Sequence, residues 1–240
     1  MYIWFFISVL GLIATVPLHF LSVEHLKLQK RYGRERGTKI GEIYGLISGW
    51  SFFLFWIGIW FSPQPRFTIP IFQNLSGFIP VVSFSIPLLH LIICAFFLLP
   101  GAWLAIRGIK ETTLKVAETH RTETIVTAGV YSVVRHPQYL GALLAHTGIS
   151  FLLSAWYSLL LTPLMIALIY LISKKEEEEL IREFGKEYED YKKKVPMLIP
   201  RSRSRQKERI TANNTALVFR DDSCARLIEE ANFGHKHRSG

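Results

Sequence analysis

Long apolar runs separated by short polar segments fill the chain up to Ile172. A helix of about 20 apolar residues crosses a hydrocarbon layer about 30 Å thick. The pattern therefore predicts an all-α, polytopic membrane protein with about five spans, at residues 2–23, 42–61, 77–106, 139–153 and 155–172. The last two spans form a helix-turn-helix hairpin around Ser154, and the first of this pair is short for a full crossing.

The positions of proline and glycine predict the shape of one of these spans and the packing of another. Residues 77–106 contain Pro80, Pro87 and Pro100. Two antiparallel spans would need about 40 residues, so we interpret this stretch as one long, kinked span with an irregular start. In the second span the four-residue spacing of Gly41, Gly45 and Gly49 favours close packing against a neighbouring helix.

The distribution of basic residues predicts the orientation. Residues 24–41 are rich in Lys and Arg, whereas Arg66 is the only cation in residues 62–76. The positive-inside rule places the first segment in the cytoplasm and the N-terminus outside. Five spans then bring residues 107–138 and the C-terminal end to the cytoplasmic side. The net charge of +9 follows this topogenic pattern, so we expect no nucleic-acid partner.

Cysteine and histidine point to no metal chemistry. Cys94 lies in an apolar run and Cys224 in the distal tail, which fits neither a disulfide framework nor a metal site. We expect no metal. His90 and His146 lie inside predicted spans, where an interhelical hydrogen bond is a better explanation than a functional role.

Beyond Ile172 the chain becomes polar. A Glu run begins here, and apolar or aromatic positions at spacings of three and four predict an amphipathic helix along the membrane face: Leu180, Ile181, Phe184, Tyr188 and Tyr191. No membrane periodicity follows Pro200, so residues 201–240 are expected to be a disordered tail with at most a short helix near 225–231. Three regions result: a three-span region at 1–106, a core with a cytoplasmic site at 107–200, and the tail.

The first candidate for chemistry is the junction at 127–141, where a polar segment enters an apolar helix. Gly129 permits a bend with positive φ, and Pro137 suits the first turn of the helix. Arg135 and His136 then lie at a helix N-terminus, which favours binding of a carboxylate. The alternative is that both residues anchor the helix end among lipid headgroups.

The second candidate is the Glu run at 176–179, which in isolation is typical of a solvated helix face. Taken together, the two segments resemble the isoprenylcysteine carboxyl methyltransferase family over about residues 110–200. The matching positions of the first motif are Gly129, Tyr131, Arg135, His136, Pro137, Tyr139 and Gly141. Those of the second motif are Glu176, Glu177, Leu180, Phe184, Gly185 and Tyr188.

The resemblance implies a membrane methyltransferase that uses S-adenosylmethionine and acts on a lipophilic or prenylated acceptor among membrane lipids. We predict that Arg135 and Glu177 are catalytic, with Glu177 as a general base if the acceptor is an amine. The resemblance assigns the following residues to the cofactor: Thr124, Ile125, Val126, Tyr131, His136, Pro137, Gln138, Tyr139 and Glu176.

Two departures from the family pattern affect the acceptor more than the cofactor. Glu123 stands where the family often has His, and Ile172 stands where it commonly has an Arg for the substrate carboxylate. Lys174 or Lys175 could replace that cation with a different geometry. Methylation of a prenylcysteine carboxylate is therefore in doubt.

Alternatives remain open. The acceptor could be a phospholipid amine or another lipid, because related phospholipid N-methyltransferases have similar Arg-His-Pro and Glu-Glu motifs. A membrane reductase of the sterol type would use a nicotinamide cofactor instead. A non-catalytic membrane protein that has kept the motif is the third possibility.

Overall fold

The computed structural model describes residues 2–71, 76–79, 84–112 and 124–200. The predicted tail at 201–240 lies outside these residues. The helices are α1 (Ile3–Val23), α2 (His25–Tyr32), α3 (Arg34–Phe61), α4 (Leu88–Thr112), the 3₁₀ helix η2 (Gly129–Ser132), α6 (Pro137–Leu152), α7 (Trp156–Leu160), α8 (Thr162–Phe184) and α9 (Lys186–Lys194). The strands are β1 (Ser76–Ile79) and β2 (Phe84–Pro87).

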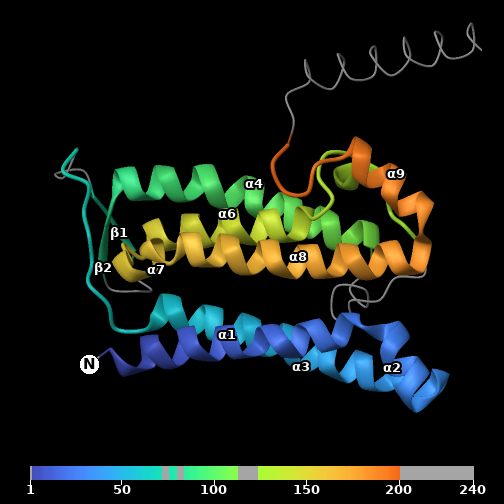
Figure 1. The fold of residues 1–240 in the computed structure, drawn as a ribbon. Helices are drawn as coiled ribbons and strands as arrows, with labels where there is room; N and C mark the ends of the chain where they lie inside the picture. The colour runs from blue at the N-terminus through green and yellow to red at the C-terminus, as the bar shows by residue number, and fades with distance from the viewer. Residues whose placement is uncertain (1, 72–75, 80–83, 113–123, 201–240) are drawn as a thin grey trace, which may run out of the picture. The chain divides into compact units, whose positions relative to one another are not determined.

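The long helices form two layers. Helices α1 and α3 lie side by side in one layer, and α4, α6 and α8 form the other (Figure 1). A buried apolar cluster joins them, with Leu12 from α1, Trp56 and Ile59 from α3, and Met165 and Ile169 from α8. The described residues up to Ile199 form one compact unit. The boundary at residue 106 stays a prediction.

Large apolar side chains also cover the outside of the helices, as a membrane protein requires. Leu10 on α1 is 66% exposed and Phe96 on α4 is 72% exposed. Among the described residues, α1, α3 and α4 are long and apolar enough to cross a membrane. This confirms an integral membrane protein with mostly helical structure, and the count of five crossings stays a prediction.

The hairpin turns where the sequence predicts it. Helix α6 ends at Leu152, and Ser154 adopts a positive φ of 51° before α7 and α8 run back. A separate helix beginning after Ile172 is not observed, however, because α8 continues to Phe184 and carries the whole Glu run. Residues 170–178 contain no helix breaker. Gly185, with φ 55°, ends α8, and the separate helix α9 follows.

Two other segments differ from the prediction. The basic segment at 24–41, expected as a loop between two spans, is helical. Helix α2 lies within it, and α3 begins at Arg34 instead of residue 42. The irregular start of the third span includes an antiparallel β ribbon that pairs Ser76 with Pro87, so the fold is not purely α-helical. Pro87 has no N–H to donate to the hydrogen bonds between the strands. It is the last residue of β2, directly before α4.

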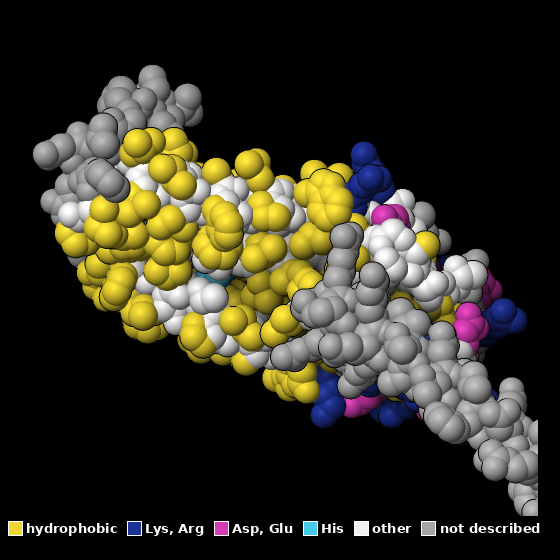
Figure 2. All heavy atoms as spheres, turned by 90° about the horizontal axis from the view of Figure 1, so that it is seen from above, with side chains coloured by type: hydrophobic (Ala, Val, Ile, Leu, Met, Phe, Trp, Pro, Cys, Tyr) yellow, Lys and Arg dark blue, Asp and Glu magenta, His cyan; other side chains and the backbone are white. Residues whose placement is uncertain are grey.

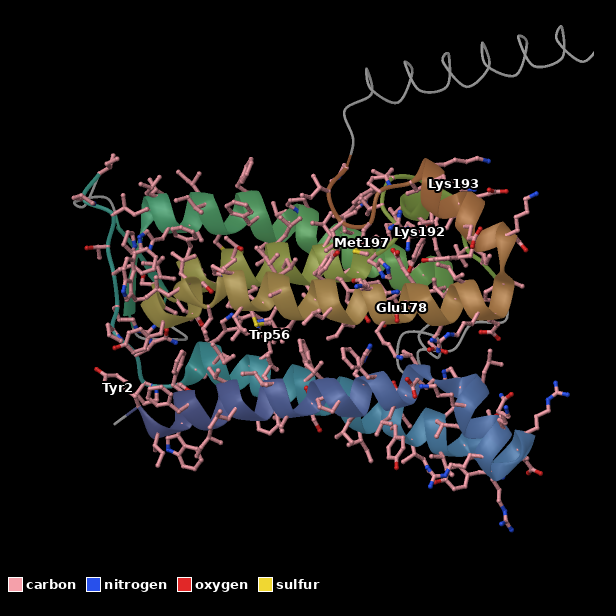
Figure 3. All side chains as sticks on the ribbon, viewed as in Figure 1. Tyr2, Trp56, Glu178, Lys192, Lys193 and Met197 are labelled. Atoms are coloured by element: carbon pink, nitrogen blue, oxygen red, sulfur yellow. The ribbon has the colours of Figure 1, made fainter. Side chains whose placement is uncertain are left out.

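Buried polar bridges lock the hairpin to its neighbours. His146 of α6 accepts hydrogen bonds at Nδ1 from the indole N–H of Trp56 at 2.8 Å and of Trp60 at 3.1 Å. Its Nε2 lies 3.1 Å from the Ser158 carbonyl, so Nε2 carries the proton. His90 Nδ1 lies 2.9 Å from the Ser154 hydroxyl. His146 thus makes the interhelical bonds that the sequence predicts, whereas His90 bonds to the turn between α6 and α7. Figure 3 shows Trp56 between the layers.

Small residues bring α4 and α6 into backbone contact. A Cβ atom on Gly101 would lie 2.8 Å from the Gly141 carbonyl oxygen, and one on Gly141 would lie 2.5 Å from the Gly101 oxygen. In α3, by contrast, only part of the predicted glycine stripe faces a neighbour. Gly41 contacts His25, whereas a Cβ on Gly49 would meet open space.

We expect Gly141→Ala to lower the unfolding temperature of the detergent-solubilised protein, because α4 and α6 must separate to admit the methyl group. Overpacking of this kind destabilises by about 1–3 kcal/mol. Gly49→Ala is the matched control, since it adds the same methyl group to a helix without a contact. An equal unfolding temperature for both variants would contradict the close approach of α4 and α6.

Candidate active site

The polar segment before α6 is held on two sides. Gly129 has φ 58°, and a Cβ atom there would overlap the carboxylate of Glu111 on α4. Glycine is therefore favoured by the bend, and its lack of a Cβ leaves room for this carboxylate, which accepts the Val130 N–H at 3.0 Å. From α9, the Tyr191 hydroxyl donates to the Tyr131 carbonyl at 2.6 Å. The loop thus bridges α4 and α9.

Glu177 is the buried centre of the site. Its side chain is completely buried, and Oε1 accepts a hydrogen bond from Arg135 Nε at 2.7 Å. His136 Nε2 lies 3.3 Å from the same oxygen, and Lys192 Nζ lies 3.0 Å from Oε2. Lys192 belongs to α9, above the polar end of α8 (Figure 3). One carboxylate therefore joins α6, α8 and α9.

The charges around Glu177 determine its ionisation. Burial by itself raises the pKa of this carboxyl, but hydrogen bonds from His136, Arg135 and Lys192 outweigh burial and lower the pKa to about 2. Glu177 is therefore an anion at neutral pH and a weak proton acceptor. Its position favours organisation of the site over service as a general base.

Backbone groups complete the shell around Arg135. Its Nη1 donates to the Lys192 carbonyl at 3.0 Å and also to the Val195 carbonyl. The segment after α9 pairs with the residues before α6, because Arg135 N donates to the Pro196 carbonyl at 2.9 Å and His136 N to that of Met197 at 3.1 Å. Figure 3 shows Met197 beside this helix end. The carboxylate that this helix end holds belongs to the chain's own Glu177.

Glu176 points in another direction, because successive residues on a helix differ by about 100°. Tyr139 donates its hydroxyl to Oε1 of Glu176, and His19 Nε2 lies 3.1 Å from the same oxygen. The His136 ring stacks on Tyr139 with an interplanar angle of 11°, and its Nδ1 lies 3.5 Å from Glu176 Oε2. His136 therefore stands between the two glutamates of the motif.

A pocket opens over Glu176. Predicted cofactor-binding residues from both motifs line it: Thr124, Ile125, Val126, Tyr131, His136, Gln138, Tyr139 and Glu176. Arg135 also lines the pocket, whereas Glu177 lies beneath it. Pro137 is buried and does not line it, because it packs toward α4, where a Cβ on Gly108 would lie 3.3 Å from Pro137 Cγ.

Other wall residues were not among the predicted cofactor-binding residues. Glu179, Leu180 and Glu183 line the pocket from α8, three, four and seven residues beyond Glu176. Helical periodicity could have identified them, since these spacings share one face. Val23 and His25 from the α1–α2 junction also line the pocket. No local signal marks these two residues, because only tertiary packing brings them there.

The electrostatics of the pocket suit a cationic ligand with aromatic parts. Carboxylates of Glu176, Glu179 and Glu183 lie in its wall. Glu179 is paired with Arg182 and Lys175, and the charge of Arg135 is compensated by Glu177. Tyrosine rings and aliphatic side chains provide the apolar faces, on which a cation also binds favourably. Burial raises the pKa of Tyr131, so its hydroxyl stays protonated at neutral pH.

Comparison with known proteins agrees with this arrangement. Residues 89–187 match the family model of phospholipid methyltransferase. The chain is 37% identical over 96 residues to protein-S-isoprenylcysteine O-methyltransferase of Schizosaccharomyces pombe. The aligned part covers 39% of this chain and 40% of the relative. This part of the chain is related to the isoprenylcysteine methyltransferases.

Two further relatives extend the comparison. Methanethiol S-methyltransferase 2 of Bradyrhizobium diazoefficiens is 35% identical over 111 residues, which cover 46% of this chain and 39% of the relative. The human protein-S-isoprenylcysteine O-methyltransferase is 35% identical over 96 residues. The aligned part covers 35% of this chain and 30% of the human protein. The chain thus spans two fifths or less of the length of these curated relatives. No solved structure matches it.

The position of the missing family Arg lies away from the pocket. Ile172 is 4% exposed and belongs to the apolar cluster with Met165 and Ile169. Lys174 is exposed, and Lys175 Nζ lies 2.6 Å from Glu24 Oε1. Neither lysine is among the residues that line the pocket. The structure therefore offers no support for replacement of the Arg by either lysine.

Proposed function

We propose that this protein is an integral-membrane methyltransferase that uses S-adenosylmethionine and modifies a lipophilic acceptor. The observation that carries the proposal is the pocket, which residues of the motif before α6 and of the motif within α8 line together. The match to phospholipid methyltransferase over residues 89–187 supports it. The related isoprenylcysteine enzymes support it as well.

The residues of the pocket fit the proposed cofactor. When bound, S-adenosylmethionine supplies a methyl group on a sulfonium, a cation that becomes a neutral thioether after transfer to the acceptor. Glu176 provides negative charge, and Tyr131 and Tyr139 provide aromatic faces for such a cation. Ile125, Val126 and Leu180 provide apolar surface that excludes water. Fixed groups of this kind accelerate a displacement by alignment and electrostatics.

In this proposal Arg135 and Glu177 act through position. Their buried ion pair fixes the end of α6 against α8 and α9, and it orients His136 at the edge of the pocket. Pro137 fixes the first turn of α6 and leaves the adjacent Gln138 facing the pocket, where its amide donates to the Tyr131 hydroxyl at 3.1 Å.

We also propose that the pocket and the C-terminus face the cytoplasm, with five crossings and the N-terminus outside. Apolar side chains cover one end of the visible face, whereas Lys, Arg, Asp and Glu gather at the other (Figure 2). Helix α2, with the basic residues Lys27, Lys30 and Arg31, lies at the end of the bundle that holds the pocket. The positive-inside rule assigns this end to the cytoplasm.

Methylation of a lipid amine is a second candidate, and the acidic pocket favours it. A carboxylate acceptor needs a cation in a low-dielectric site, but Ile172 lies in the apolar core and Arg135 is already paired with Glu177. An amine acceptor must instead lose a proton before it attacks. Glu183 lies in the pocket wall and offers a carboxylate for that proton, whereas Glu179 is paired with Arg182 and Lys175.

Labelled S-adenosylmethionine tests the proposal directly. The protein in lipid bilayers is incubated with the labelled cofactor, a total lipid extract and a prenylcysteine analogue, and products are identified by mass. We expect a labelled lipophilic product that is absent without protein. A label in an amine lipid supports the second candidate, and a label in the prenylcysteine ester supports the carboxylate acceptor.

The control separates this function from that of a sterol-type reductase. S-adenosylhomocysteine should raise the unfolding temperature of the protein, because a ligand at 100 times its dissociation constant stabilises by about 2.7 kcal/mol. NADPH should leave that temperature unchanged. Stabilisation by NADPH together with no labelled product would overturn the proposal in favour of the reductase.

A further inference from the structure

Helix α1 lies outside the residues that match the family model, yet its end forms part of the pocket. Val23 and His25 line the pocket from the α1–α2 junction. Glu24, between them, pairs with Lys175 at 2.6 Å, next to Glu176 in the sequence of α8. The N-terminal helix is therefore attached to α8 beside the proposed cofactor site.

His19 makes the most specific of these contacts. It is 6% exposed on α1, and its Nε2 lies 3.1 Å from Oε1 of Glu176. The Tyr139 hydroxyl donates to the same oxygen. A histidine within an apolar span is unfavourable unless it finds a polar partner. Glu176 is such a partner, and it lies in the wall of the pocket.

We propose that His19 is a positioning residue, which holds the Glu176 carboxylate in the orientation that binds the cofactor. The inference rests on the proposed function. Because Oε1 is held by donors from both α1 and α6, the carboxylate occupies one orientation before the ligand arrives. A group that is already ordered loses less conformational freedom on binding. Helix α1 is thus part of the methyltransferase site and is more than a membrane anchor.

The test is a double-mutant cycle on the full chain in detergent, with S-adenosylhomocysteine affinity measured by calorimetry. Loss of one hydrogen bond to a charged group should weaken binding about tenfold in His19→Ala. His19→Gln, which retains a side-chain N–H donor, should restore most of the affinity. In a Glu176→Gln background, His19→Ala should cause little further loss, because its effect passes through that carboxylate.

Thr15→Val is the matched control. Thr15 lies one helical turn before His19, is 4% exposed and donates to the Leu12 carbonyl of its own helix. This variant alters the packing of α1 but leaves the contact with Glu176 intact. Its affinity for S-adenosylhomocysteine should therefore equal that of the wild type. If Thr15→Val weakens binding as much as His19→Ala, α1 acts through packing alone and the inference is wrong.

Two other results would overturn the inference, and they differ from failure of the proposed function. The first is wild-type affinity in His19→Ala. The second is an equal loss from His19→Ala in the wild-type and Glu176→Gln backgrounds, which would show that His19 does not act through Glu176. A wild-type protein that binds no S-adenosylhomocysteine would overturn the proposed function and the inference together.

Discussion

Glu177→Ala is expected to destabilise the protein by about 3–5 kcal/mol, because it leaves Arg135 as a buried charge without its counterion. Such a loss is comparable with the net stability of a small domain, roughly 5–15 kcal/mol. The Arg135 side chain is buried at 7% exposure, and it also donates to the backbone carbonyls of Lys192 and Val195. Thermal unfolding in a fixed detergent measures the effect.

Glu178→Ala is the matched control for this variant. Glu178 follows Glu177 on α8 but is exposed, and Figure 3 shows it at the surface of the helix. Its removal should change stability by less than about 0.5 kcal/mol. The double variant Arg135→Met with Glu177→Leu should recover part of the stability, because it removes both buried charges. Equal unfolding temperatures for Glu177→Ala and Glu178→Ala would contradict the role of the buried pair.

The same carboxylate gives this prediction a pH dependence. Since the pKa of Glu177 is depressed from 4.5 to about 2 in the folded protein, its contribution is complete above pH 4.5 and is lost as the pH falls toward 2. A shift of this size corresponds to about 3 kcal/mol. The wild type should therefore lose more stability between these pH values than Glu177→Leu does.

Glu176→Gln and His136→Ala are each expected to weaken binding of S-adenosylhomocysteine by about 10- to 150-fold. Charge-assisted hydrogen bonds contribute about 1.5–3 kcal/mol, and each 1.4 kcal/mol is tenfold in affinity. Both side chains line the pocket, and Gln preserves the shape of Glu176 while it removes the charge. Isothermal titration in detergent measures the dissociation constants.

Folding must be preserved for this result to be informative. Glu178→Gln, the same substitution two residues along α8, should bind like the wild type because Glu178 does not line the pocket. The unfolding temperature of Glu176→Gln should remain close to that of the wild type, since the amide still fills the site. If both Glu176→Gln and His136→Ala retain full affinity, the proposed cofactor site is wrong.

Local rules explain which features could be read from the chain. The apolar runs specify membrane helices because a helix of that length satisfies its own backbone in lipid. The turn at Ser154 and the bend at Gly129 follow from local breaks between apolar segments, where both residues adopt a positive φ. Arg135-His136-Pro137 and Glu176-Glu177 marked two segments that the structure brings to one pocket, through Arg135, His136 and Glu176.

Other features depend on distant contacts. The continuation of α8 through the Glu run could not be inferred from polarity alone, since Glu177 is polar in sequence but fully buried between Arg135, His136 and Lys192. The sequence shows two adjacent glutamates of one motif. Only the fold separates them, with Glu176 in the pocket wall and Glu177 beneath it.

By itself, the sequence determined the membrane class and the hairpin, and it predicted the two motifs that contribute side chains to the pocket, because these depend on composition and on spacing along one helix. The tertiary structure alone decided that His19, Val23 and His25 reach the pocket from α1 and α2. It also decided that Ile172 joins the apolar core instead of the site. These placements result from packing between helices far apart in the chain, and no local periodicity encodes such contacts.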